Sequence, residues 1–394
     1  MKDARWALPL IVLAEVLGTS IWFCGTAALD ELTPLWSLDA NQRGSLLTVV
    51  QLGFIAGTLF LSMTGLADAF SASRVFAVSA CFGAAANLAF AWFSRDMTDA
   101  LAWRFATGLA LAGIYPLGMK LVVTWMSHRT GEALGWLVGS VSLGTSLPFL
   151  LRAMGGVGHW QIVVTCASVF ALLAGILMLL LGDGPAARPP ARRFDPRAGI
   201  RSFLHPDFRA SALGYFGHMW ELYAFWSMTP FLVTWITDDP YARAWWTFII
   251  IACGAIGNVL GGWYSRRFGS GFVAVLALAV SGLMCLAGPL LPSLPVGLVI
   301  VGLIVWGLSA PADSPQFSAL SAKACQPDAV GSSLALQNAI GFSVTVVSIQ
   351  LTAALVDSWQ SWISWLWLPG PLLGVYWMRR LARIAPARAE RKAD

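Results

Sequence analysis

Six ionisable side chains lie inside long apolar segments of the chain, and these residues are the best placed to do chemistry. They are Glu15, Arg104, Lys120, His218, Glu221 and Asp313. A charge at the middle of a bilayer costs at least about 2.5 kcal/mol, so each of these groups must face protein or water. Groups of this kind bind ions, carry protons or attract charged solutes, and we expect no catalytic residues among them.

Helical spacing assigns roles to the histidine and two of the carboxylates. His218 and Glu221 lie one turn apart, which favours Glu221 as a proton carrier that His218 tunes; the alternative is that the two side chains simply satisfy each other. Glu15 is either a second proton or cation site or a partner for Tyr115. The tryptophans expected to stack on a solute are Trp22, Trp220 and Trp226.

The remaining three groups favour electrostatic roles. Arg104 lies in the outer part of its segment and attracts an anionic solute group or a proton carrier; the alternative is a surface ion pair with Asp96 or Asp99. Lys120 and Asp313 lie in the cytoplasmic thirds of two segments in opposite halves of the chain. We expect them to form an ion pair that closes an inner gate, unless Lys120 only extends its ammonium group to the membrane surface.

The composition indicates which elements position these residues. The chain has 394 residues, of which 57% are hydrophobic and 11% are charged, less than half the charged share of a soluble domain. These figures exclude both a water-soluble globule and a disordered chain. At about 20 residues for each crossing, the apolar segments predict twelve transmembrane helices. Their approximate bounds are 7–29, 44–65, 73–93, 100–124, 132–154, 160–181, 210–236, 244–264, 271–291, 295–319, 331–356 and 360–378.

Several other classes of protein do not fit the sequence. The six cysteines lie in or beside apolar segments without paired spacing, so we expect small core residues rather than a disulfide, and no metal site. The net charge of +5 follows no basic stripe, which argues against nucleic-acid binding. No Gly-x-x-x-x-Gly-Lys-Ser sequence occurs, which argues against an ATP-driven pump. No cofactor is expected.

Basic residues concentrate in alternate loops, and this sets the orientation of the chain. The N-terminus, the middle loop and the tail carry most of them, so we expect all three in the cytoplasm and the protein in the cell (inner) membrane. The first segment is expected to be retained, because its apolar core is too long for a signal peptide. The middle loop 182–208, rich in Pro, Ala and Arg, predicts an extended linker between six-helix bundles at 1–181 and 209–394, the second with a basic tail.

A short sequence recurs in the two halves of the chain. Residues 68–71 read Asp-Ala-Phe-Ser after the second segment, and residues 266–269 read Arg-Arg-Phe-Gly after the eighth, at an offset of 198 residues. In the first copy, Leu66 and Ala67 precede Asp68. Together with Arg-Phe-Ala-Thr-Gly at 104–108, these motifs resemble the Major Facilitator Superfamily of secondary transporters over essentially the whole chain. The residues to which the resemblance gives a conformational role are Asp68, Arg266 and Arg267.

The resemblance also implies a fold. It predicts an all-α polytopic membrane protein with twelve transmembrane helices in two six-helix bundles around a central cavity. The first, fourth, seventh and tenth helices of this family line the cavity, and all six buried ionisable groups fall in those four segments. Their distribution therefore agrees with the implied fold.

The expected function is secondary active transport of a small solute by alternating access, coupled to protons. The expected partners are the solute, protons and the lipid bilayer, and we expect a monomer. One alternative is a copper-type transition-metal importer, because His218 adjoins Met219. Others are a non-transporting sensor and an intramembrane enzyme such as an acyltransferase, for which His218 and Glu221 lack a nucleophile on their helix face.

Overall fold

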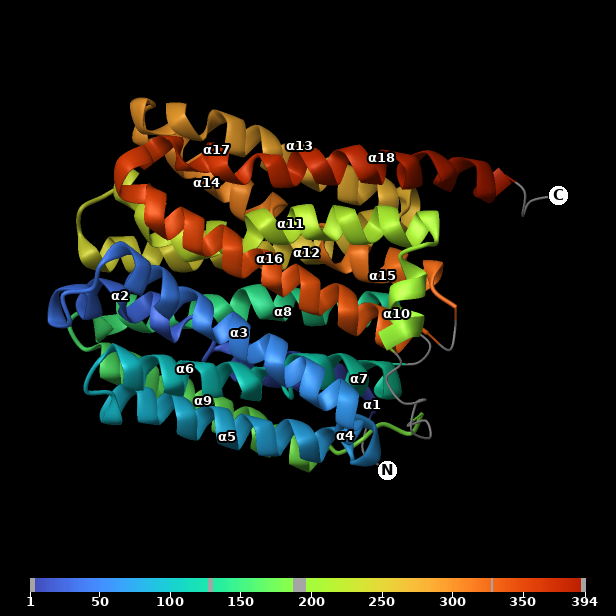
Figure 1. Ribbon diagram of the computed structural model, residues 1–394, viewed down its shortest axis with the longest axis horizontal. Coiled ribbons are helices and arrows are strands. Elements are labelled where there is room, and N and C mark those ends of the chain that lie inside the picture. Colours follow the sequence, from blue (N-terminus) through green and yellow to red (C-terminus); the bar gives the residue numbers. More distant parts are fainter. Residues whose placement is uncertain (1–3, 127–129, 187–195, 327–328, 391–394) are drawn as a thin grey trace.

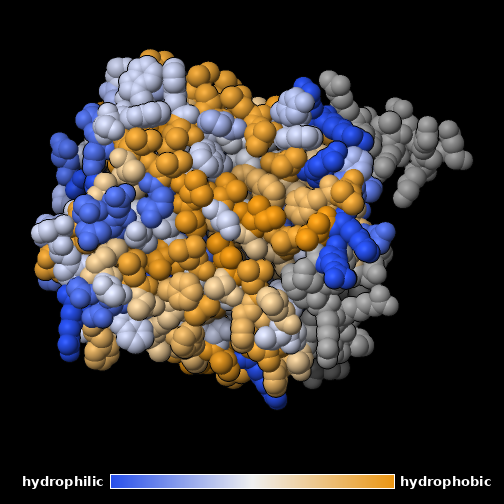
Figure 2. Space-filling model, viewed as in Figure 1, coloured by the Kyte–Doolittle hydropathy of each residue, from blue (hydrophilic) through white to orange (hydrophobic). Residues whose placement is uncertain are grey.

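The computed structural model describes residues 4–126, 130–186, 196–326 and 329–390, and every regular element in these ranges is helical. Most helices run along the long axis of the molecule (Figure 1). On the face shown in Figure 2, apolar side chains cover most of the middle, and polar side chains gather toward both ends. Ten apolar segments of the described chain are long enough to cross a membrane. One of them, Val330–Ala382, contains two crossings, and the more polar α11 (Pro206–Leu232) is a further one. The result is the twelve-helix layout that the sequence predicts.

The first six crossings form one bundle, drawn in blue to green in the lower half of Figure 1. Its helices are α1 (Ala4–Thr19), α2 (Cys24–Leu35), α3 (Ala40–Thr64), α4 (Leu66–Ala69), α5 (Ala72–Phe93), α6 (Met97–Leu111), α7 (Tyr115–Trp125), α8 (Thr130–Leu151), the π-helical turn η1 (Arg152–Gly156) and α9 (Trp160–Leu181). We call this the N-bundle.

The last six crossings form the C-bundle, in the upper half of Figure 1. Its helices are α11, the short turn η2 (Val233–Trp235), α12 (Pro240–Phe268), α13 (Ser270–Ala287), η3 (Gly288–Ser293), α14 (Val296–Ser309), α15 (Ser314–Ala324), α16 (Val330–Trp359), η4 (Gln360–Ile363), α17 (Ser364–Trp367) and α18 (Pro369–Glu390). Both chain termini lie at one end of the molecule, which we call the terminal end; the opposite end is the distal end.

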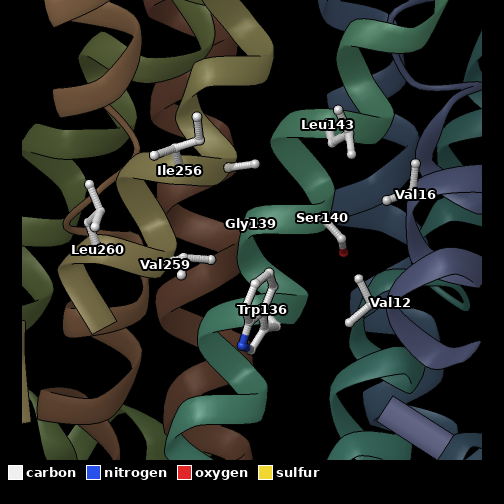
Figure 3. Close-up of a pocket in the computed structure, with 10 residues that line it drawn as sticks. Val12, Val16, Trp136, Gly139, Ser140, Leu143, Ile256, Val259 and Leu260 are labelled. Carbon is white, nitrogen blue, oxygen red and sulfur yellow. The ribbon is translucent and has the colours of Figure 1, made fainter. Parts of the chain in front are cut away.

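The most extensive contacts between the bundles are those of α3 with α16 and of α8 with α12. Small residues let α8 and α12 approach closely: a methyl group added at Gly139 would lie 3.1 Å from the carbonyl oxygen of Ala255. Beside this contact, an apolar groove of about 250 Å³ runs past Trp136 and Leu143 (Figure 3). The two helices therefore approach closely through their backbones at this seam, where the side-chain amide of Asn258 on α12 also donates a hydrogen bond to the hydroxyl of Ser142 on α8 at 3.4 Å.

Three crossings are broken near the middle of the membrane. The first is interrupted between Thr19 and Cys24, and the fourth between Leu111 and Tyr115. In the tenth, α14 ends at Ser309, 198 residues after the end of α6, and α15 begins at Ser314. This offset equals that of the repeated loop sequence, so the two bundles repeat the same broken helix.

Aspartates begin the two equivalent helices α3 and α12. The side chain of Asp39 accepts a hydrogen bond from the backbone N–H of Gln42, and Asp239 accepts one from Ala242 at 2.7 Å. Both are N-caps, which satisfy backbone donors that have no partner within the helix. The second and eighth crossings thus start in the same way, at the distal end.

The middle loop differs from the extended linker that its composition predicts. Its described part contains the helix α10 (Pro196–Ser202), which packs against α16. The hydroxyls of Ser202 and Ser333 share a hydrogen bond of 2.7 Å there. A segment of this composition can be solvated on its own, but here it is helical where it contacts Ser332, Ser333 and Leu336 of α16.

Asp183 joins the end of the N-bundle to the start of α5. Its carboxylate accepts hydrogen bonds from the backbone N–H groups of Ser73 (2.8 Å) and Ala72, and from the hydroxyl of Ser71. Partial burial raises its pKa, but these hydrogen bonds outweigh that effect and hold the pKa of Asp183 below its usual value. The carboxylate thus caps α5 at the terminal end.

Candidate functional site: a cavity between the bundles

A cavity of about 60 Å³ lies between the bundles near mid-membrane. At this size the cavity has room for only a few water molecules, and we call this narrow state the closed form. Residues of both bundles line it, and most are polar or aromatic. They include Tyr115, Ser142, Tyr215, His218, Tyr223, Trp226, Asn258, Ser314, Asn338 and Phe342.

His218 lines the cavity, and its partner is Asp313. The ring Nδ1 of His218 lies 2.7 Å from the carboxylate of Asp313, and Nε2 lies 2.8 Å from the hydroxyl of Ser314. Asp313 sits in the break between α14 and α15 and is fully buried. The sequence expected Asp313 to pair with Lys120, but the structure pairs it with His218; Lys120 lies in the second turn of α7.

Glu221 faces the interior of the C-bundle. One carboxylate oxygen accepts a hydrogen bond from the indole N–H of Trp306 at 2.8 Å, and the other accepts one from the hydroxyl of Ser281 at 2.9 Å. The thiol of Cys285 adds a third donor. These donors lie on α13 and α14, and Glu221 is absent from the cavity wall. Donors of its own bundle satisfy this carboxylate, and the alternative in which Glu221 and His218 satisfy each other does not form.

Glu15 lies in the N-bundle behind the cavity wall. The side chain is fully buried, and neither carboxylate oxygen has a hydrogen-bond partner among the described residues. It rests on the first turn of α7, where a methyl group added at Gly118 would nearly coincide with its carboxylate. Tyr115, in the same turn, lines the cavity. The structure thus brings Glu15 beside the cavity but without the hydrogen bond to Tyr115 that was one expectation.

Arg104 holds the break in the first crossing. Its guanidinium donates hydrogen bonds to the backbone carbonyls of Ile21 (2.9 Å) and Trp22, and to the side-chain oxygen of Asn87 at 2.7 Å. It is 1% exposed, so the surface ion pair that was the alternative does not form; Asp96 instead caps α6. The sequence analysis did not identify Asn87 as part of the site, although an isolated amide side chain in an apolar segment was a signal for it.

Aromatic side chains adjoin the cavity on its distal side. We call the following six residues the aromatic layer: Trp22, Phe23, Phe54, Tyr223, Trp226 and Phe342. Trp220, also expected as a stacking residue, lies elsewhere: its indole donates to the carbonyl of Leu366 within the C-bundle. Of the three expected tryptophans, the structure therefore brings Trp22 and Trp226 to the layer.

A second hollow, of about 240 Å³, lies beyond the aromatic layer toward the distal end. We call it the vestibule. Among the residues that line it are Asp30, Arg43, Ser227, Arg243 and Asp357. Arg43 of α3 pairs with Asp357 of α16, so an ion pair joins the bundles at its rim. These charges escaped the sequence reasoning because they lie at helix ends, where charged residues are ordinary.

The residues expected to hold one conformation lie at the terminal end. Arg266 and Arg267 occupy the last turn of α12, and the guanidinium of Arg267 lies over the ring of Phe268. The side chain of Asp68 lies outside the described part of the structure. The nearby carboxylate that caps a helix here is Asp183, as described above.

The protein thus consists of two six-helix bundles that cross a membrane and enclose a polar cavity at their interface. The chain belongs to the Major Facilitator Superfamily, whose family model matches residues 6–348. It is accordingly a transporter of small solutes and not an enzyme.

Two curated relatives match parts of the chain. The niacin transporter NiaP of Acinetobacter baylyi is 32% identical over 146 residues, which cover 34% of this chain and 32% of that protein. The putative uncharacterized transporter YgaY of Escherichia coli K12 is 27% identical over 175 residues, 43% of this chain and 42% of that one. The chain therefore matches less than half the length of either relative.

Solved structures match the fold over nearly the whole chain. The xylose transporter XylE of E. coli, in a partially occluded inward-open conformation, has a TM-score of 0.77 at 11% identity and covers 96% of this chain and 98% of that one. A bacterial homologue of the human lysosomal transporter Spinster, inward-facing, has a TM-score of 0.65 at 16% identity, covering 97% and 96%. Identities this low establish the fold alone.

Proposed function

We propose that the protein is a proton-coupled carrier in which Glu15 and the His218–Asp313 pair carry the coupling protons. The observation that carries this proposal is the surroundings of Glu15. An ionised carboxylate that is fully buried without a donor or counter-charge is very costly, so Glu15 holds a proton in this closed form. Glu221, which the sequence favoured for this role, has three donors and no access to the cavity.

The closed form explains how proton movement is tied to conformational change. Glu15 and Asp313 are fully buried, so neither can exchange a proton with water until the bundles separate. Both adjoin the start of a half-helix that follows a break, α7 for Glu15 and α15 for Asp313. Rocking of the bundles moves these half-helices and opens the proton sites and the cavity together, so the solute and the proton cross in the same cycle.

The proposed orientation places the terminal end in the cytoplasm of a cell with an inner membrane. Both chain termini and α10 lie at this end, where the sequence concentrates its basic residues (Figure 1). Residues 182–208 then form the cytoplasmic connector between bundles 1–181 and 209–394. The carrier acts as a monomer, because each chain contains both bundles and the cavity between them.

Niacin is the first solute to test, because a relative that matches about a third of the chain bears the name of a niacin transporter. The purified protein is reconstituted in liposomes, and niacin uptake is measured with and without an inward proton gradient. Glu15→Gln should lose gradient-driven accumulation and retain exchange of labelled for unlabelled niacin. Glu221→Gln is the matched control, since it changes a buried carboxylate outside the cavity wall and should retain gradient-driven accumulation.

A second measurement does not depend on the solute. Infrared difference spectra of the purified protein should contain the band of a protonated carboxyl group near neutral pH, and Glu15→Gln should remove it. Accumulation in Glu15→Gln equal to that of the unchanged protein, with the infrared band intact, would refute the assignment of Glu15 as a coupling group.

A further inference from the structure

The aromatic layer crosses the interface between the bundles. Trp22, Phe23 and Phe54 belong to the N-bundle, and the other three rings belong to the C-bundle. Each N-bundle ring lies against a ring of the opposite bundle. The shortest centroid distances across the interface are 5.8 Å for Trp22 to Tyr223, 6.0 Å for Phe23 to Trp226 and 4.5 Å for Phe54 to Phe342.

The layer separates the central cavity from the vestibule. Trp226 lines the cavity, whereas the next residue, Ser227, lines the vestibule. On the N-bundle side, Trp22 belongs to the layer and Thr26, one turn further along the chain, lines the vestibule. A solute that moves between the two hollows must therefore pass through this layer, and the rings of the two bundles must separate to admit it.

Two indole groups in the layer have unused donors. The Nε1 atoms of Trp22 and Trp226 are buried and have no hydrogen-bond acceptor among the described residues, although each side chain is only 2% exposed. Other buried indoles of the chain are paired: Trp306 donates to Glu221 and Trp367 donates to Thr352. An unpaired buried donor is costly, and an indole can only donate. The layer therefore presents two donors that an acceptor from outside the chain can satisfy.

We propose that the aromatic layer is the solute-binding site and that it selects small, flat aromatic solutes that carry a hydrogen-bond acceptor such as a carboxylate. This inference rests on the proposed carrier function and names the class of its solute. When the bundles separate, ring faces that now pack on each other lose their partners. A flat ring placed between them restores the stacking, and its carboxylate accepts hydrogen bonds from Trp22 and Trp226.

The test is direct binding to the purified full-length protein by isothermal titration calorimetry. The probes are benzoate and nicotinate, with cyclohexanecarboxylate as the analogue that keeps the charge and loses the flat ring. We expect both aromatic acids to bind about ten-fold more tightly than the saturated acid, the upper range for stacking between aromatic rings. Trp226→Phe keeps a ring and removes the N–H, and it should weaken nicotinate binding by about ten-fold. Trp226→Leu should in addition remove the preference for the flat ring.

Trp220→Phe is the matched control. Trp220 lies on the same helix as Trp226, and its replacement by Phe likewise removes an indole N–H. That N–H donates to Leu366 outside the layer, so nicotinate binding should stay unchanged. The melting temperature of each variant reports whether it is folded, and Trp22→Phe provides a second variant of the layer. Equal binding of the three acids, no binding at millimolar concentration, or unchanged binding in both Trp22→Phe and Trp226→Phe would overturn the inference.

These outcomes are separate from those that test proton coupling. Binding of aromatic acids without gradient-driven accumulation would refute the coupling proposal and leave the site intact. Proton-coupled uptake of solutes that do not depend on Trp22 or Trp226 would refute the site and leave the coupling intact.

Discussion

The ion pair between Arg43 and Asp357 is expected to hold the vestibule closed at its rim. It joins α3 to α16, one of the two most extensive helix contacts between the bundles. Arg43→Gln removes the charge while retaining a polar side chain of similar reach. We expect this change to increase the fraction of molecules in which the distal end is open.

The size of the effect follows from the exposure of the pair. The side chain of Arg43 is 25% exposed and that of Asp357 is 67% exposed, so water screens their attraction. Pairs of this kind contribute about 1 kcal/mol at most, which corresponds to a factor of about five in the ratio of open to closed molecules. High salt should weaken the pair in the unchanged protein and so reduce the difference between the two proteins.

Ser227 offers a position at which opening can be measured. It lines the vestibule, is 4% exposed, and its hydroxyl has no hydrogen-bond partner, so Ser227→Cys removes no described contact. Its reaction with a membrane-impermeant thiol reagent should be up to about five-fold faster in Arg43→Gln, measured relative to protein without the new cysteine. Exchanging the two charges, Arg43→Asp with Asp357→Arg, should restore the slow rate. Equal rates in all three backgrounds would show that the pair does not hold the rim closed.

Three further changes test the fold that supports the site. Arg104→Leu leaves three buried acceptors without their donor and should lower the free energy of unfolding by about 3 kcal/mol, measured by denaturant titration in detergent. Gly139→Leu forces α8 away from α12, and we expect a cost of about 1–3 kcal/mol in the same titration, with reduced exchange transport. Asp183→Ala should cost about 1 kcal/mol near neutral pH. Hydrogen bonds lower the pKa of Asp183 in the folded protein, so its contribution to the free energy of unfolding is fully present above the usual pKa of about 4. That contribution disappears as the pH falls through the lower pKa of the folded protein. The difference in free energy of unfolding between Asp183→Ala and the unchanged protein should therefore disappear there.

The sequence predicted the layout of the fold well because the layout depends on patterns that the chain itself carries. The lengths of the apolar segments predicted the membrane crossings. The 198-residue offset of the repeated loop sequence equals the offset between the breaks in the fourth and tenth crossings. The breaks themselves were not predicted. No proline lies inside the 20–23 or 112–114 interruption, and the Arg104 contact that satisfies the first break joins residues more than 80 positions apart.

The site was harder to predict because spacing along one helix does not determine which neighbouring helix a side chain meets. His218 and Glu221 are one turn apart, yet Asp313 of the tenth crossing meets the first and Trp306 of the same crossing meets the second. Local periodicity identified both residues as buried and polar. The packing of α13 and α14 against α11 decides whether the carboxylate of Glu221 meets hydrogen-bond donors or the cavity. That packing is a property of the whole bundle.

The buried charges and the helix breaks explain each other. A break leaves backbone carbonyl and N–H groups without partners inside the membrane, and these must be satisfied within the protein. Arg104 satisfies two carbonyls in the first break, and Asp313 stands in the break of the tenth crossing with His218 as its partner. The broken helix in turn gives a costly charge a polar position that a continuous helix lacks. In the proposed carrier cycle, rocking of the bundles bends the chain where its helices are already interrupted, at the segments that Arg104 and Asp313 support.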